Sequence, residues 1–84
     1  MHPHHARALR VARRNYKASC NIVEGRRKLY LRCREAYIYN VYTQGLAPNT
    51  LPLSQAVDAL QLALEVQLDA LAVLETVERL LANA

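Results

Sequence analysis

The segment TQGLAPNTLPLSQ, residues 43–55, separates two long stretches of helical pattern and thereby decides the fold. Gly45 suits the left-handed residue that closes a helix, and Pro48 follows where a helix cannot easily continue. With two glycines and three prolines in 84 residues, the chain offers few turns for β-hairpins, and its composition favours helix. We therefore expect one all-α domain over residues 1–84, an antiparallel helical hairpin with a connecting loop at residues 45–53.

The segment before the loop, residues 6–44, has the pattern of one amphipathic helix with a basic back. Bulky residues recur every seven positions with small or polar residues between them, which predicts a seam against another helix. The bulky edge of the seam is Tyr16, Val23, Tyr30 and Tyr37, and the other edge is Ala12, Ser19, Arg26, Cys33 and Asn40. The residues expected to widen it are Val11, Ala18, Ile22, Leu29 and Ala36. The opposite face carries Arg7, Arg10, Arg14, Lys17, Lys28 and Arg32.

Gly25 interrupts this first helical segment, at a cost of about 1 kcal/mol relative to alanine. A continuous or mildly kinked helix would absorb that cost. A short turn at EGRR, residues 24–27, would instead divide the hairpin into three helices. We expect the continuous helix.

The second segment, residues 54–82, is acidic and apolar around most of its circumference. Its first residue can be capped by Ser54, or by Thr50 with Pro52 just inside the helix. Two apolar lines lie on nearly opposite sides: Leu60, Leu64, Leu68, Leu71 and Leu74 on one, and Leu62, Val66, Val73, Val77 and Leu80 on the other. One neighbouring helix covers only one such line, so we expect the second to meet another chain, for example in a dimeric four-helix bundle.

The two halves of the chain carry opposite charge. Residues 1–44 contain ten lysines and arginines and two glutamates, a net charge of +8, whereas residues 54–84 contain five acidic residues and one arginine, a net charge of −4. Opposite charges favour the antiparallel alignment, although each exposed pair contributes only about 0–1 kcal/mol. The excess of positive charge favours a solvated face or an acidic protein partner, with a phosphate backbone or an anionic membrane surface as the alternatives.

The N-terminal residues 1–5, MHPHH, are predicted to form a flexible tail, because Pro3 opposes a helical arrangement of His2, His4 and His5. No carboxylate or cysteine is near enough in sequence to complete a metal site with these histidines. We therefore expect no metal there.

Cys20 and Cys33 are expected to be buried thiols rather than a disulfide. On one helix, their positions lie about 20 Å apart. No segment has the length and apolar character of a membrane span, and no secretory signal is visible. Reduced thiols and these absences favour a cytoplasmic protein.

No enzyme motif is present: the sequence lacks a glycine-rich phosphate loop, a nucleophile elbow, CxxC and HExxH. We therefore expect no catalytic residue, no cofactor and no small-molecule substrate. The prediction is a non-enzymatic protein–protein interaction module, such as a small adaptor, chaperone or inhibitor, that forms a homodimer, binds a larger protein, or does both.

The residues that we expect at the partner interface are Leu62, Val66, Val73, Val77, Leu80, Tyr39 and Tyr42. Those expected to contact an anionic partner are Arg7, Arg10, Arg14, Lys17, Lys28 and Arg32. The alternative is a dimeric nucleic-acid-binding regulator that lays the same basic face on phosphates.

Overall fold

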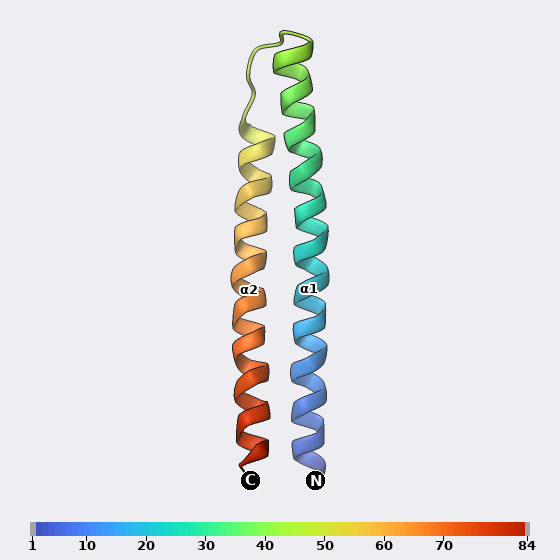
Figure 1. Cartoon of the computed structure of the whole chain (residues 1–84), viewed down its shortest axis with the longest axis vertical. Coiled ribbons are helices and arrows are strands. Elements are labelled where there is room, and N and C mark those ends of the chain that lie inside the picture. The colour runs from blue at the N-terminus through green and yellow to red at the C-terminus, as the bar shows by residue number, and fades with distance from the viewer. Residues whose placement is uncertain (1, 84) are drawn as a thin grey trace.

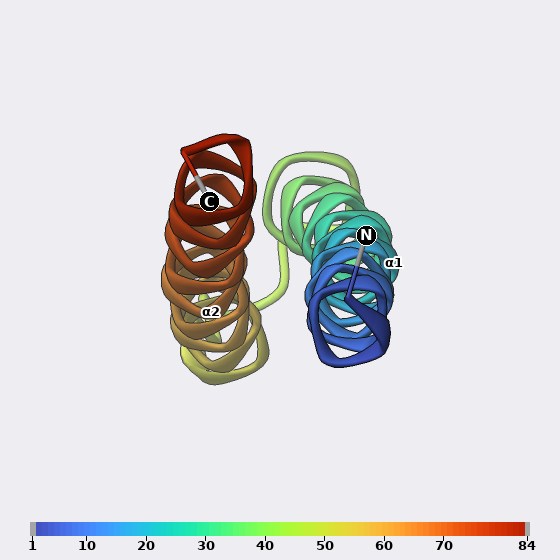
Figure 2. The same cartoon turned by 90° about the horizontal axis from the view of Figure 1, so that it is seen from below.

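The computed structural model describes residues 2–83 as two long helices that run antiparallel side by side (Figure 1). Helix α1 spans Pro3–Ile38 and continues into a short π-helical segment, η1, at Tyr39–Thr43; helix α2 spans Leu51–Ala82. The Cα atoms occupy 63 × 13 × 13 Å, and Figure 2 shows the hairpin end-on as a single layer of two helices. The predicted all-α helical hairpin is confirmed. Its pairing into a four-helix bundle stays a prediction.

Helix α1 begins at Pro3, earlier than the sequence predicted. Proline is well tolerated in the first turn, because the N–H that it lacks has no partner there in any helix. The His4 N–H donates to Nδ1 of His2, 3.2 Å away, and this contact caps the helix. The structure thus corrects the tail predicted for residues 1–5: Pro3–His5 are helical, and Met1 lies outside the described residues.

Helix α1 passes through Gly25 without a break, as predicted. Glu24 and Arg27 form an ion pair across this glycine, with Arg27 Nη2 2.8 Å from Glu24 Oε1. The hydrogen bonds from Arg27 lower the pKa of the Glu24 carboxyl, and the same contact raises the pKa of Arg27. An exposed pair three residues apart supports the helix weakly, and here it spans the glycine, the residue of lowest helix propensity in α1 after Pro3.

The first helix closes at Gly45, as predicted, through a wider turn than an α-helix has. In η1 the Gln44 N–H donates to the Tyr39 carbonyl at 3.1 Å, and the Leu46 N–H donates to the Asn40 carbonyl at 2.8 Å. Gly45 then takes a φ of 67°, in the left-handed region that glycine adopts readily.

Helix α2 begins at Leu51, three residues before the predicted start at Ser54. Its N-cap residue is Thr50, the second of the two expected capping positions, although the threonine side chain makes no capping bond. Oδ1 of Asn49 instead accepts from the Leu51 N–H at 3.2 Å. Pro52 fits the first turn for the same reason that Pro3 fits α1.

Small side chains hold the two helices together. The predicted seam of α1 is covered by α2, with the exceptions of Arg26 and Asn40, which are exposed. The α2 side of the seam comprises Leu53, Ala56, Leu60, Ala63, Gln67, Ala70, Leu74, Val77 and Leu81. Three buried residues of this helix, Ala56, Ala63 and Leu74, lie on that seam.

A contact at mid-length sets the register. Nε2 of Gln67 lies 3.3 Å from Sγ of Cys20, so these two residues are level. Counting away from them in opposite directions at about 1.5 Å per residue places Tyr16, Val23 and Tyr30 each within one residue of an α2 alanine. On the seam face, the small α2 residues nearest in level are Ala70 for Tyr16, Ala63 for Val23 and Ala56 for Tyr30. Large residues against small ones let the helices approach closely.

Candidate protein-interaction surface

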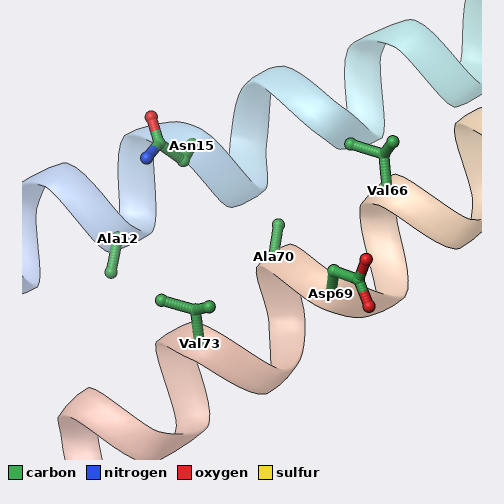
Figure 3. Close-up of a pocket in the computed structure, with 6 residues that line it drawn as sticks. All are labelled: Ala12, Asn15, Val66, Asp69, Ala70 and Val73. Atoms are coloured by element: carbon green, nitrogen blue, oxygen red, sulfur yellow. The ribbon is translucent and has the colours of Figure 1, made fainter.

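A groove runs along one side of the hairpin, between α1 and α2. It consists of two adjoining depressions that share Val66. The first is lined by Ala12, Asn15, Val66, Asp69, Ala70 and Val73 (Figure 3). The second is lined by Ile22, Arg26, Ala59, Leu62, Ala63 and Val66. We call this surface the apolar groove, because most of its lining residues are aliphatic.

The floor of the groove is the helix seam itself. In Figure 3, Ala70 and Val73 project from α2 toward α1, and Ala12 projects back toward them. Ala12 is buried, whereas Val73 remains exposed at the open side. Two polar residues, Asn15 and Asp69, complete the lining. The arrangement is a shallow apolar strip interrupted by these two polar residues.

Arg26 is the one basic residue in the lining of the apolar groove. It stands on the seam edge of α1 but is exposed. Its aliphatic stem can cover apolar surface while the guanidinium reaches water, as long basic side chains commonly do. The presence of Arg26 is therefore compatible with a groove whose lining is largely apolar.

The predicted interface residues of α2 lie on the groove side. Leu62, Val66 and Val73 line the groove, and all three are exposed. Leu80 is also exposed and continues the row seven residues beyond Val73. Val77 differs, because it belongs to the seam and is half-buried against α1.

The structure corrects the two apolar lines predicted for α2. Helix α1 does not cover the first line as a whole: Leu60, Leu71 and Leu74 are covered, while Leu64 and Leu68 are exposed. The buried seam lies between the two lines, on the alanines. The sequence prediction followed the large side chains and did not include this seam, although Ala56, Ala63 and Ala70 recur every seven residues.

The α1 wall of the groove also departs from the prediction. Ile22 and Leu29 were expected to widen the covered seam, yet both are exposed. They belong instead to a second row that alternates small and large residues: Val11, Asn15, Ala18, Ile22, Gly25 and Leu29. Its three-and-four spacing was the signal that could have identified the row as a second helix-packing face.

Tyr39 and Tyr42 stand apart from the groove, in η1 at the loop end of the hairpin. Tyr42 is 77% exposed, and the Tyr39 hydroxyl accepts a long 3.4 Å hydrogen bond from Gln44 Nε2. These two aromatic rings are free to contact another molecule, although they share no surface with Leu62 or Val73.

The predicted anion-contacting residues are all exposed on α1. Arg7, Arg10 and Arg14 line one shallow depression together with Val11. Across residues 2–83 the structure contains one ion pair, Glu24 with Arg27, and none that links α1 to α2. The charge of the arginine row is therefore available to an outside partner.

The polar contacts of the seam surround Cys20. The hydrogen bond and the charge of this neighbouring thiol raise the pKa of Tyr16, with burial as a lesser cause. Ser19 donates to the Tyr16 carbonyl at 2.6 Å, within its own helix. Cys20 and Cys33 are free thiols, both half-buried. Of these contacts, only the one between Gln67 and Cys20 joins the two helices.

Residues 2–83 contain no group of three histidine, cysteine, aspartate or glutamate side chains placed to hold a metal ion. Over the same residues, neither helix has an apolar stretch sufficient to span a bilayer. Comparisons with protein-family models, with curated proteins and with solved structures gave no match. The case for a function therefore depends on the surface of the hairpin.

Proposed function

We propose that this chain is a non-enzymatic protein-interaction module, of the adaptor, chaperone or inhibitor kind. The apolar groove is its contact surface, and the basic row of α1 steers an acidic partner toward it. The observation that carries the proposal is the open groove: Leu62, Val66 and Val73 of α2 and Ile22 of α1 are exposed along one side of the hairpin.

The energetic argument concerns the cost of leaving that groove in water. Burial of apolar surface stabilises by about 25 cal/mol per Å², so a few hundred Å² correspond to several kcal/mol. A domain of this size has a total stability of the same order. No large side chain among residues 2–83 is fully buried, so the hairpin alone has little core to compensate.

Charge supplies the steering. The +8 of residues 1–44 is spread along the outside of α1, away from the groove for most residues. Exposed charge of one sign raises the rate of encounter with a partner of the opposite sign more than it raises the final affinity. An acidic protein is the partner that this distribution favours.

The test is affinity capture from the native host with three baits. Leu62→Glu places a charge in the apolar groove, and Leu68→Glu places the same charge on the same helix outside it; their exposures are closely matched at 62% and 64%. We expect a protein that the wild type and Leu68→Glu capture and that Leu62→Glu loses. Equal capture by all three baits would contradict the groove as the contact surface.

A second candidate function is a dimeric nucleic-acid-binding regulator. The observation that favours it is the row of Arg7, Arg10 and Arg14 on successive turns of α1, without an acidic partner in the described chain. Phosphate contacts make binding fall steeply with salt. Titration into labelled duplex at two salt concentrations, repeated with Arg10→Ala and Arg14→Ala combined, tests this candidate. Lack of binding near 50 mM salt would exclude it.

A further inference from the structure

We infer that the apolar groove is covered by a second copy of this chain. The two hairpins lie with their loops at the same end, so that α1 of each copy packs on α2 of the other. This inference rests on the proposed function, because it names the partner of the same groove. Four observations support it: the excess of exposed surface area, large residues opposite small ones, one polar residue in each apolar row, and the opposite net charges of the two helices.

The chain exposes more surface than a compact protein of its mass. A monomer of 9.5 kDa is expected to expose about 5,000 Å², and this chain exposes 6494 Å². Its radius of gyration of 19.0 Å likewise exceeds the value of about 12 Å expected for 84 residues. The excess of exposed surface area over the expected value is larger than the roughly 800 Å² that each partner buries in a standard interface. Pairing of two hairpins along their length would remove such an excess.

The two walls of the groove are complementary in size. In the same-end arrangement the two-fold axis runs along the bundle, so every residue keeps its level. The α1 row of one copy then meets the α2 row of the other in the register already seen within one chain. In the register set by Cys20 and Gln67, Leu62 is level with Gly25, which lines an adjoining α1 depression with Ile22 and Arg26. A leucine of one copy thus meets the glycine of the other, where nothing beyond the adjacent backbone of α1 lies within 4 Å of the missing Cβ.

One polar residue interrupts the apolar row of each helix: Asn15 on α1 and Asp69 on α2. Asn15 and Asp69 line the same depression, about one helical turn apart along the hairpin in the register set by Cys20 and Gln67. Neither side chain makes a hydrogen bond to another residue in the described part of the chain. In the same-end dimer, Asn15 of each copy lies within about one helical turn of Asp69 of the other. The amide is a donor and the carboxylate an acceptor, so the pair satisfies both groups when they are covered.

Helix charge selects this orientation over the reversed one. In the same-end dimer each basic α1 has an acidic α2 on both sides, one from its own chain and one from the second copy. With the loops at opposite ends, α1 would instead pack on α1, and two segments of net charge +8 would lie side by side. Like charges along neighbouring helices oppose association.

The mass of the protein in solution is the first test, by light scattering or sedimentation equilibrium. The wild type should have twice the 9.5 kDa chain mass. Leu62→Glu should shift it to the monomer mass, and Leu68→Glu should leave the dimer intact. Helical circular dichroism of each variant verifies that the helices still form. A wild type that stays monomeric at 100 µM, or a dimer that persists in Leu62→Glu, would overturn the inference.

The orientation has its own test. A nitroxide label at Leu46→Cys, in a Cys20→Ser and Cys33→Ser background that still dimerises, reports the distance between the two loops. Loops at the same end should give about 20–30 Å, set by the roughly 10 Å spacing of packed helices and the label arms. A distance approaching the 63 Å length of the hairpin would overturn the same-end arrangement.

These results separate the inference from the proposed function. A monomer that captures a host protein through the groove would refute the second copy as occupant and leave the interaction module standing. A groove-dependent dimer that captures nothing would support the second copy and refute a larger protein as the partner.

Discussion

Gly25 has one environment in the single chain and another in the inferred dimer, where Leu62 of the second copy faces it. In the single chain it lies inside a continuous helix, and an added Cβ would meet nothing within 4 Å. Gly25→Ala should therefore stabilise the monomeric hairpin by about 0.5–1 kcal/mol, because alanine loses less backbone entropy on folding. Thermal unfolding in the Leu62→Glu background, where the groove is kept open, measures this effect without the second copy.

Gly45 provides the matched control for this substitution. Its φ of 67° is unfavourable for any residue with a Cβ, so Gly45→Ala should destabilise the same background by about 1–2 kcal/mol. A loss of stability in Gly25→Ala as well would contradict the open space seen beside that glycine.

At the scale of the helices, the sequence predicts most of what the structure contains. Both helices, the closing glycine and the α1 seam follow from residue spacing, because heptad periodicity directly reports which face of a helix is covered. The boundaries were less accurate: Pro3 was expected to oppose helix and α2 was placed from Ser54, although Pro3 and Pro52 lie inside first turns, the latter as the Thr50 alternative allowed. The α2 seam was not predicted, because alanines contribute much less than leucines to a hydrophobic pattern, although small residues are the ones that pack against the tyrosines of α1.

Gln67 is the polar residue at the centre of the α2 seam. It is half-buried and contacts Cys20, a weak hydrogen-bond acceptor. A polar residue at such a position specifies register at a cost in stability. Gln67→Leu should therefore raise the free energy of unfolding by about 1 kcal/mol, since it adds apolar burial and sacrifices only a weak contact.

Denaturant unfolding of Gln67→Leu, compared with Gln61→Leu, measures that effect. Gln61 is exposed on the same helix, so its replacement should change stability by less than about 0.5 kcal/mol. A lower stability of Gln67→Leu would show that the contact with Cys20 outweighs the added burial.

For the whole molecule, the decisive quantity is the area that two helices leave in water. The buried residues between 2 and 83 are one leucine, three alanines and one serine, a core that is thin for 84 residues. The sequence predicted an uncovered apolar line on α2; Leu62, Val66, Val73 and Leu80 of that line are exposed, whereas Val77 is half-buried. The sequence did not predict which α1 residues border that line, because this depends on the register between Cys20 and Gln67.

If two copies share one core, folding and association are coupled, and stability must depend on protein concentration. A tenfold rise in concentration favours the dimer by about 1.4 kcal/mol, which for two chains of 84 residues corresponds to a rise of about 4 °C in Tm. Calorimetry over a hundredfold range should show this slope for the wild type and for Leu68→Glu. Leu62→Glu should unfold at a lower Tm that does not move with concentration, since its hairpin has only itself to pack against. A wild-type Tm independent of concentration would mean that the thin core of one hairpin suffices, and the energetic argument for a second copy would fail with it.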